Sequence, residues 1–478
     1  MKSSANPFFL FIIPTGLASA CLAIFILWLP PKHNELTKRL PGMDSAPPRN
    51  KMRIGPSNVR IGEFFQKFTN KIPLNGIGKW PCFRGVKRNN RSGSTTKISN
   101  NWCKKKPKPK WCITLLGEGH AAPAVLNGKV YLLDYDEKLK ADTLRCFKLK
   151  DGKELWRRWY KIKIKRNHGI SRTIPAVTDK FVVSIGPKCQ TMCVDACSGD
   201  FKWGIDMVRD LGAETPFWYT GQCPLIDKDV AILAPCGKKI LMMGVDCETG
   251  KTVWTTPNDL KWKMSHSSII TAVVNGKKTY VYAALGGIIG VSAEKKDCGK
   301  ILWKTTAWSV SVVAPSPVYL GDGKFLITSG YGAGGMLFHL DSKNKINIIK
   351  KYPPQKGICS EQQTPVAVGN KIYSILPKDA GRLRKRFACF SNDNCEKPIW
   401  TSDEKFGLGP YIFVDGKFLI LDDDGTLSII NFNETPPVSL GKFQAIPNGH
   451  DAWGPIAVAG SKLLIRDLTR LYCYDLSE

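Results

Sequence analysis

The sequence predicts an all-β protein, an eight-bladed β-propeller of four-stranded antiparallel blades, preceded by one transmembrane helix. Three observations predict it: a motif of about ten residues recurs, strand-type residues alternate with hairpin turns, and the two ends of the repeat region complement each other. The motif is clearest as Cys146–Trp156, Cys193–Trp203 and Gly244–Trp254, and later copies start at positions 290, 338, 389, 429 and 473. Seven intervals separate positions 146 and 473, a period of about 47 residues that is typical of propellers.

Each repeat is interpreted as four short strands. In the first repeat, Ala122–Leu126 and Lys129–Leu133 flank an Asn-Gly pair, which is the strongest two-residue signal for a hairpin. A third strand over Leu144–Leu149 turns at Asp-Gly into a fourth over Glu154–Trp159. Glycine in these turns supplies the positive φ that tight hairpins need. Four antiparallel strands per repeat predict one blade each.

The number of blades follows from the ends of the chain. The eighth repeat stops at Glu478, before a fourth strand could form. The segment Lys110–Leu115 precedes the first blade and carries Trp111, so we expect it to close the last blade beside Leu471–Leu476. An unclosed blade would leave an exposed edge. Seven blades is the alternative if the weak repeat around Ile429 is misread.

These repeats resemble the PQQ-like (pyrroloquinoline-quinone-like) propeller family, and Gly244–Trp254 is the closest match to its motif. The segment Trp80–Gly93 is also similar to the Trp-Pro-x-Phe-Arg-Gly opening of exported bacterial PQQ-like proteins. The resemblance covers about residues 80–478, is nearest to the outer-membrane assembly lipoprotein type, and specifies fold better than function. It implies that a small residue and a tryptophan dock neighbouring blades, the tryptophans being Trp111, Trp156, Trp203, Trp254, Trp303 and Trp400.

The front of the chain is apolar and then basic. Phe8–Leu29 holds 22 residues without a charge, enough to span a bilayer, and is predicted to be an uncleaved anchor. A cleaved signal peptide ending at Ala18-Ser-Ala20, or a lipoprotein acceptor at Cys21, are the alternatives. We expect residues 1–29 to be the anchor, 30–79 a basic linker with prolines, and 80–478 the propeller.

The orientation of that anchor has two interpretations. Basic residues after the span favour a cytoplasmic propeller by the positive-inside rule. The short tail before the apolar run is the usual layout for export, so we place the propeller on the non-cytoplasmic side. The net charge of +30 is concentrated in residues 1–110, where runs such as Lys104–Lys110 indicate a solvated linker or a contact with anionic lipid or polyanion. No nucleic-acid module is recognisable, so nucleic-acid binding is not expected.

Sixteen cysteines raise the question of redox or metal chemistry. The chain has no Cys-x-x-Cys-His motif and no zinc-type Cys-x-x-Cys pair, so neither covalent haem nor zinc is expected. Four cysteines occupy the small-residue position of different blades and are interpreted as buried apolar residues that do not bridge one another: Cys146, Cys193, Cys389 and Cys473. A few disulfides elsewhere stay open, since they depend on an oxidising compartment.

Polar residues precede the first strand of several blades, where the mouth of a central channel would lie. They could solvate the channel, line a pocket for a ligand or partner, or, least expected, carry catalysis. The candidates are His120, Arg172, His266, Glu361, Gln362, His450 and Asp451.

Two functions fit this sequence. The first is a non-catalytic, monomeric propeller tethered to the membrane, which serves as a protein-interaction scaffold in the cell envelope and needs no cofactor or metal. The alternative is a quinoprotein dehydrogenase with PQQ and calcium. The family's alcohol dehydrogenases use a vicinal Cys-Cys disulfide, which this chain lacks, and a calcium-binding set that cannot be matched residue by residue. The sequence therefore favours the scaffold.

Overall fold

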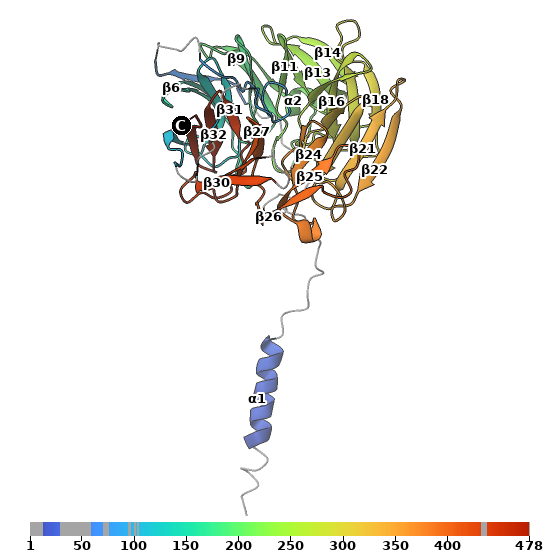
Figure 1. The fold of residues 1–478 in the computed structure, drawn as a ribbon. Coiled ribbons are helices and arrows are strands. Elements are labelled where there is room, and N and C mark those ends of the chain that lie inside the picture. The colour runs from blue at the N-terminus through green and yellow to red at the C-terminus, as the bar shows by residue number, and fades with distance from the viewer. Residues whose placement is uncertain are drawn as a thin grey trace, which may run out of the picture. The chain divides into compact units, whose positions relative to one another are not determined.

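The computed structural model describes residues 13–28, 59–69, 76–93, 97–99, 102, 105–431 and 437–477. The chain divides into two compact units, Met1–Met52 and Arg53–Glu478. The first unit contributes helix α1 (Ile13–Trp28), and every described strand belongs to the second (Figure 1).

Helix α1 lies within the segment predicted to be a membrane anchor. It has 16 residues, and its side chains from Thr15 to Phe25 are exposed. Among the described residues, no helix is both long enough and apolar enough to cross a membrane. Residues 8–12 and 29 of the predicted span lie outside the described residues.

The second unit consists of eight antiparallel sheets, as predicted. Blade 1 contains β3 (Ala124–Leu126), β4 (Lys129–Asp136), β5 (Ala141–Lys148) and β6 (Glu154–Lys161). Blade 2 contains β7 (Ala176–Val177), β8 (Phe181–Ile185), β9 (Gln190–Asp195) and β10 (Phe201–Asp206), and is followed by the short helix α2 (Met207–Leu211). Blade 3 contains β11 (Leu225–Asp227), β12 (Val230–Leu233), β13 (Ile240–Asp246) and β14 (Thr252–Pro257).

The remaining blades repeat this order. Blade 4 contains β15 (Ile270–Val274), β16 (Lys277–Ala284), β17 (Gly287–Ser292) and β18 (Ile301–Thr305). Blade 5 contains β19 (Val318–Gly321), β20 (Lys324–Ser329), β21 (Gly334–Leu340) and β22 (Ile346–Tyr352). Blade 6 contains β23 (Val366–Val368), β24 (Lys371–Ile375), the 3-10 turn η4 (Gly381–Leu383), β25 (Arg386–Ser391) and β26 (Trp400–Lys405). Blade 7 contains β27 (Tyr411–Val414), β28 (Lys417–Leu421), β29 (Thr426–Asn431) and β30 (Val438–Gln444).

The eighth blade joins the two ends of the repeat region. It contains β31 (Ala457–Ala459), β32 (Lys462–Arg466) and β33 (Arg470–Asp475), and its fourth strand is β2 (Pro109–Thr114) from the front of the chain. Trp111 of β2 pairs with Cys473 of β33. The predicted closing strand and the count of eight blades are therefore confirmed, and the repeat around Ile429 is a complete blade.

Blade 1 has a fifth strand that the sequence did not predict. Strand β1 (Phe64–Lys67) pairs antiparallel with β6, so that Phe64 lies opposite Trp159 and their rings stack. Arg158 of β6 lies over the ring of Phe65 and donates to the carbonyl of Gly62 at 2.8 Å. Part of the segment assigned to a linker over residues 30–79 thus belongs to the propeller sheet.

Each small residue of the motif lies opposite the tryptophan of its own blade. Cys193 pairs with Trp203, and Gly244 pairs with Trp254. A Cβ atom added to Gly244 would come within 2.2 Å of the Trp254 ring. The small residue therefore makes room for the indole of its own blade, whereas the family motif led us to expect room for a neighbouring indole.

The neighbouring blade is reached through the turn between its third and fourth strands. Trp203 of blade 2 donates from Nε1 to the carbonyl of Cys247 in blade 3 at 2.9 Å, and a Cβ on Gly250 would lie 2.7 Å from its ring. Trp111 and Trp156 make the same type of bond to the next blade, at 2.9 and 3.1 Å. The turn glycines, required for the hairpins, also admit the docking indoles.

A belt of side chains links consecutive blades around the channel. In blades 3 to 6, the residues just before the first strands bond one another from blade to blade: Cys223 N donates to Ser268 Oγ at 2.9 Å and Ser268 N to Ser316 Oγ at 3.1 Å. Ser316 N then donates to Thr364 Oγ1 at 2.9 Å, and all four residues are buried. The blades are thus joined at the outer tryptophans and again at the channel.

Candidate functional site

One end of the channel is closed by residues 80–92, which we call the plug. Trp80 makes two backbone hydrogen bonds with Val125 of blade 1, each 2.8 Å long. Val177 N of blade 2 donates to Pro81 O, and Ser92 N donates to the carbonyl of Phe413 in blade 7, both at 2.8 Å. The segment recognised by its Trp-Pro-x-Phe-Arg-Gly pattern therefore spans the ring near the ends of the first strands.

Two buried arginines fix the plug to the backbone of distant blades. Arg88 donates to the carbonyls of Pro224 at 2.6 Å and Ile269 at 3.0 Å, and Arg84 donates to Pro365 O at 3.1 Å. Both side chains are nearly inaccessible. Burial lowers the pKa of Arg84 to about 10, so its guanidinium stays charged at neutral pH. The plug thereby contacts the carbonyls that follow the belt residues.

The predicted candidates precede the first strands, so they lie at the opposite end of the channel, the mouth. The best-held of them is Arg172, whose Nη2 donates to the carbonyls of Asn167 at 2.7 Å, His168 at 2.9 Å and Gly169 at 3.2 Å. Burial lowers the pKa of Arg172 to about 10. These hydrogen bonds hold the loop that joins blade 1 to blade 2. We call this loop, residues 162–169, the rim loop.

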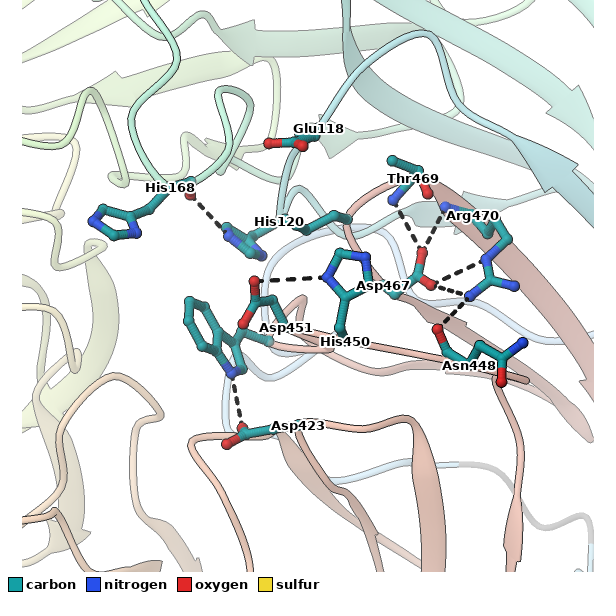
Figure 2. Close-up of polar contacts among 12 residues, drawn as sticks. Glu118, His120, His168, Asp423, Asn448, His450, Asp451, Asp467, Thr469 and Arg470 are labelled. Atoms are coloured by element: carbon teal, nitrogen blue, oxygen red, sulfur yellow. Dashed lines mark hydrogen bonds and ion pairs between the residues drawn. The ribbon is translucent and has the colours of Figure 1, made fainter.

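His120 also contacts the rim loop, through the carbonyl of His168 (Figure 2). Its Nε2 lies 2.9 Å from the carbonyl of His168, and its ring stacks on Trp453 at 5.2 Å. Trp453 in turn donates from Nε1 to Asp423 Oδ1 at 2.8 Å. Burial, with Arg172 as the next cause, holds the pKa of His120 well below its usual value. His120 is therefore a neutral packing residue at neutral pH.

His266 belongs to an aromatic cluster across the mouth. Its ring lies 5.7 Å from that of Trp218, and Trp218 stacks on Tyr331 at 5.6 Å. Burial, followed by the charge of Arg172, lowers the pKa of His266 to about 3. Arg172 also acts electrostatically on Tyr331. The mouth thus brings Arg172 together with both histidines.

Glu361 lies against Gly330 of blade 5, where an added Cβ would come within 2.7 Å of its Cγ. Glu361 is buried and pairs with Lys378, whose Nζ lies 3.3 Å from its Oε1. Lys378 also lies over the Tyr331 ring at 5.3 Å. Gln362 is half-buried. The carboxylate of Glu361 is therefore part of an ion pair.

His450 and Asp451 lie at the outer edge of the mouth. His450 Nδ1 is 3.7 Å from Asp451 Oδ2, and 63% of the histidine side chain is exposed (Figure 2). Asp451 acts electrostatically on Arg166 of the rim loop, which also forms an ion pair with Glu118 at 2.5 Å. These two candidates belong to the rim and do not enter the channel cluster.

The rim carries exposed cations beside an exposed phenylalanine and two half-buried aromatic residues. Lys163, Lys165 and Arg166 of the rim loop are exposed. Tyr219 donates its hydroxyl to the carbonyl of Lys165 at 2.6 Å, which fixes the loop against the aromatic stretch Phe217–Tyr219. The result is a rigid, basic and aromatic surface.

The described residues do not fit the calcium site and the cysteine pair of a quinoprotein dehydrogenase. No group of three His, Cys, Asp or Glu side chains in the described part of the chain is arranged to hold a metal ion. Glu361 is paired with Lys378, Asp423 accepts from Trp453, and the sequence contains no adjacent cysteines. Of the sixteen cysteines, the fifteen described are free thiols.

Sequence reasoning missed the aromatic half of the mouth and the role of the plug. The run Phe217-Trp218-Tyr219 was a visible signal, because three consecutive aromatic residues between strands have no blade position to fill. Trp453 follows the candidates His450 and Asp451 closely in sequence. The plug was recognised as a family pattern, but its long-range contacts left no periodic signal.

The fold and the mouth define a closed eight-bladed propeller whose channel is plugged at one end. The chain is similar to the PQQ-like β-propellers. A family model for the outer membrane protein assembly factor BamB matches residues 140–344. A search among curated proteins found no match.

Solved structures support the same fold at low sequence identity. BamB from Moraxella catarrhalis is 14% identical, with a TM-score of 0.52 over 77% of this chain and 97% of that one. A europium-containing methanol dehydrogenase is 11% identical, with a TM-score of 0.59 over 84% of this chain and 99% of that one. The quinohemoprotein alcohol dehydrogenase from Comamonas testosteroni is 12% identical, with a TM-score of 0.56 over 84% of this chain and 81% of that one. Scaffold-type and enzymatic propellers thus share this architecture.

Proposed function

We propose that the chain is a non-catalytic PQQ-like propeller, tethered to a membrane by its apolar N-terminal segment, that binds a protein partner in the cell envelope. The partner surface is the mouth rim. The match of residues 140–344 to a BamB model supports the scaffold class. The uncharged run Phe8–Leu29 supports the tether.

The observation that carries this proposal is that the polar residues of the mouth are bonded to other parts of the protein. The Nη2 of Arg172 donates to three successive carbonyls of the rim loop, and His120 contacts the same loop. Glu361 is held in an ion pair. A catalytic site needs groups free to meet a substrate, whereas these groups fix loops. Fixed loops suit a protein interface, because little conformational entropy is lost when a partner binds.

The rim also has the composition of a binding surface. Interfaces are enriched in aromatic residues and arginine. Tyr219 contacts Lys165, and Asn167 donates to the carbonyl of Phe217 at 3.5 Å, so the aromatic stretch Phe217–Tyr219 adjoins the basic rim loop. Basic side chains on a rigid surface favour a partner with an acidic face and accelerate its association.

Capture from solubilised envelope membranes tests this surface. The double variant Lys163→Glu with Lys165→Glu reverses charge at the rim, and Lys300→Glu with Lys304→Glu makes the same change at exposed positions of blade 4. We expect a stoichiometric partner with the wild-type chain and the blade 4 variant, and at least a tenfold loss with the rim variant. A partner held equally by both variants would remove the rim from the proposal, and no partner with any chain would refute the scaffold.

The tether is tested separately by fractionation. The full chain should stay in the membrane pellet after alkaline carbonate washing, and a chain that lacks residues 1–29 should be released. Release of the full chain would refute the tether without affecting the rim surface.

A dehydrogenase is the second candidate, because the aromatic pairs around Arg172 could hold a planar anion between rings. We expect no quinone absorbance and no dye-linked alcohol oxidation after incubation with PQQ and calcium. Saturable quenching of tryptophan fluorescence by PQQ, lost in Arg172→Met, would overturn the non-catalytic assignment.

A further inference from the structure

Two cysteines of neighbouring blades meet at the docking site of Trp203. Cys193 belongs to β9 of blade 2, and Cys247 follows β13 in blade 3. The Sγ of Cys193 lies 3.4 Å from the carbonyl oxygen of Cys247, and the Cys247 side chain is the leading cause of the raised pKa of the Cys193 thiol. The two residues are 54 positions apart, and neither is accessible to solvent.

The backbone around both cysteines is fixed by strand pairing and by the docked indole. Cys193 lies between Val183 and Trp203 in the sheet of blade 2. Cys247 N donates to Asp229 O at 2.9 Å, and its carbonyl accepts from Trp203 Nε1 at 2.9 Å. The contact is therefore held from both blades, which keeps the Cys193 thiol against the backbone of Cys247.

We propose that Cys193 and Cys247 are a disulfide-forming site that joins blade 2 covalently to blade 3. The oxidant is an external disulfide of the glutathione type or the disulfide of a thiol oxidoreductase. This inference concerns the propeller alone and does not depend on the identity of a partner.

The chemistry is two thiol–disulfide exchanges. One cysteine loses its proton and attacks a sulfur of the external disulfide, which forms a mixed disulfide and releases one thiolate. The second cysteine loses its proton and attacks the protein sulfur of that mixed disulfide, which forms the Cys193–Cys247 bond and releases the second thiolate. Both thiolates take up the two protons, so the protein loses two electrons and the external disulfide gains them.

Burial decides when this reaction occurs. The neighbouring Cys247 thiol and then desolvation raise the pKa of Cys193, so the reactive thiolate is scarce in the packed ring. We therefore expect the bond to form while the blades assemble, before Trp203 docks. Once formed, it is shielded from reductants until the ring opens.

Refolding of the full chain in a glutathione buffer tests the site. Reduced protein is unfolded in urea, refolded with reduced and oxidised glutathione, and then alkylated with iodoacetamide in denaturant. Non-reducing peptide mass spectrometry should show the Cys193 and Cys247 peptides joined, with a mass lower by two hydrogen atoms. The bond should resist dithiothreitol in the folded protein and yield to it in urea. Alkylated Cys193 and Cys247 throughout the refolded protein, or Cys193 bonded elsewhere, would overturn the proposal.

Single variants supply a stability readout. The urea midpoint of the oxidised wild-type protein should exceed that of the reduced protein, and Cys193→Ser or Cys247→Ser should abolish the difference. Cys389→Ser is the matched control, since Cys389 lies opposite Trp400 in the same position of blade 6 and the blade 7 turn contains no cysteine. That control should keep the redox-dependent difference, and its loss there would contradict the assignment. If a serine variant does not fold, the wild-type peptide map still decides.

Discussion

Trp203→Ala is the sharpest test of how the blades are held together. The indole lies between blades 2 and 3 with 7% of its surface exposed, bonds the carbonyl of Cys247, and packs against Gly250. A buried tryptophan removes about 200 Å² from water, which corresponds to about 5 kcal/mol at about 25 cal/mol per Å². Residual burial in the unfolded chain and the retained alanine reduce this figure. Loss of the hydrogen bond to the Cys247 carbonyl adds about 1 kcal/mol to the destabilisation. We therefore expect the free energy of unfolding to fall by about 3–5 kcal/mol.

Urea unfolding followed by far-UV circular dichroism measures this loss. With a slope of about 3 kcal/mol per M or more for a unit of this size, the midpoint should fall by about 1 M. Trp218→Ala is the comparison variant, because this half-buried indole stacks on Tyr331 at the mouth and does not occupy the motif position that docks into a neighbouring turn. It should shift the midpoint by less than a third as much. Trp254, half-buried and stacked on Tyr280, should give an intermediate shift.

Two results would refute this account of blade docking. One is an unchanged midpoint for Trp203→Ala, and the other is an equal shift for Trp218→Ala. Either would mean that the belt and the plug alone hold the ring together.

Three further predictions concern turns, plug and pH. Gly250→Ala should cost more than Gly276→Ala in thermal unfolding: both have positive φ and lose about 1 kcal/mol for it, but only the Cβ at 250 meets a ring, at 2.7 Å. Arg88→Met should leave two carbonyls unpaired, cost about 2–4 kcal/mol and speed amide exchange in residues 80–92, whereas exposed Arg91→Met should do neither. Burial raises the pKa of Asp142 from 3.8 to about 7. Between these values the folded state holds a proton that the unfolded state has lost, so stability should fall as pH rises, and Asp142→Asn should flatten the thermal midpoint between about pH 4 and pH 7. Equal losses within either pair, or an unchanged pH slope, would contradict the respective prediction.

Most of the fold could be predicted from short sequence patterns. The Asn-Gly and Asp-Gly turns, the period of the motif and the missing last strand were enough to predict eight blades. They also predicted closure by Trp111, which pairs with Cys473. Strand β1 was not predictable, because Phe64–Lys67 is short and its partner β6 lies about ninety residues further along. Its stability comes from stacking on Trp159, a contact with no periodic signal.

The mouth was only half predictable, for a related reason. Position relative to the first strands identified His120, Arg172 and His266, and the structure brings them together. Their roles depend on which carbonyls and rings surround them, and Arg172 alone reaches three carbonyls of one loop. His120, Arg172 and His266 were chosen as candidates for their polar chemistry. In the structure they are largely removed from solvent, and their contacts are with loops and rings of the protein.

The plug and the closing strand come from the same stretch at the front of the chain, and this couples two events in assembly. Residues 80–92 pair with blades 1, 2 and 7, while β2 completes blade 8 beside β33. The partner of β2 is β33, which consists of residues 470–475, so the ring is closed only after blade 8 has folded. Once both are in place, the first strands are bonded to the plug at one end and to one another through the belt. These bonds restrain the blades relative to one another, and a restrained ring suits the proposed role of the mouth as a surface for a partner, because little conformational entropy is lost on binding.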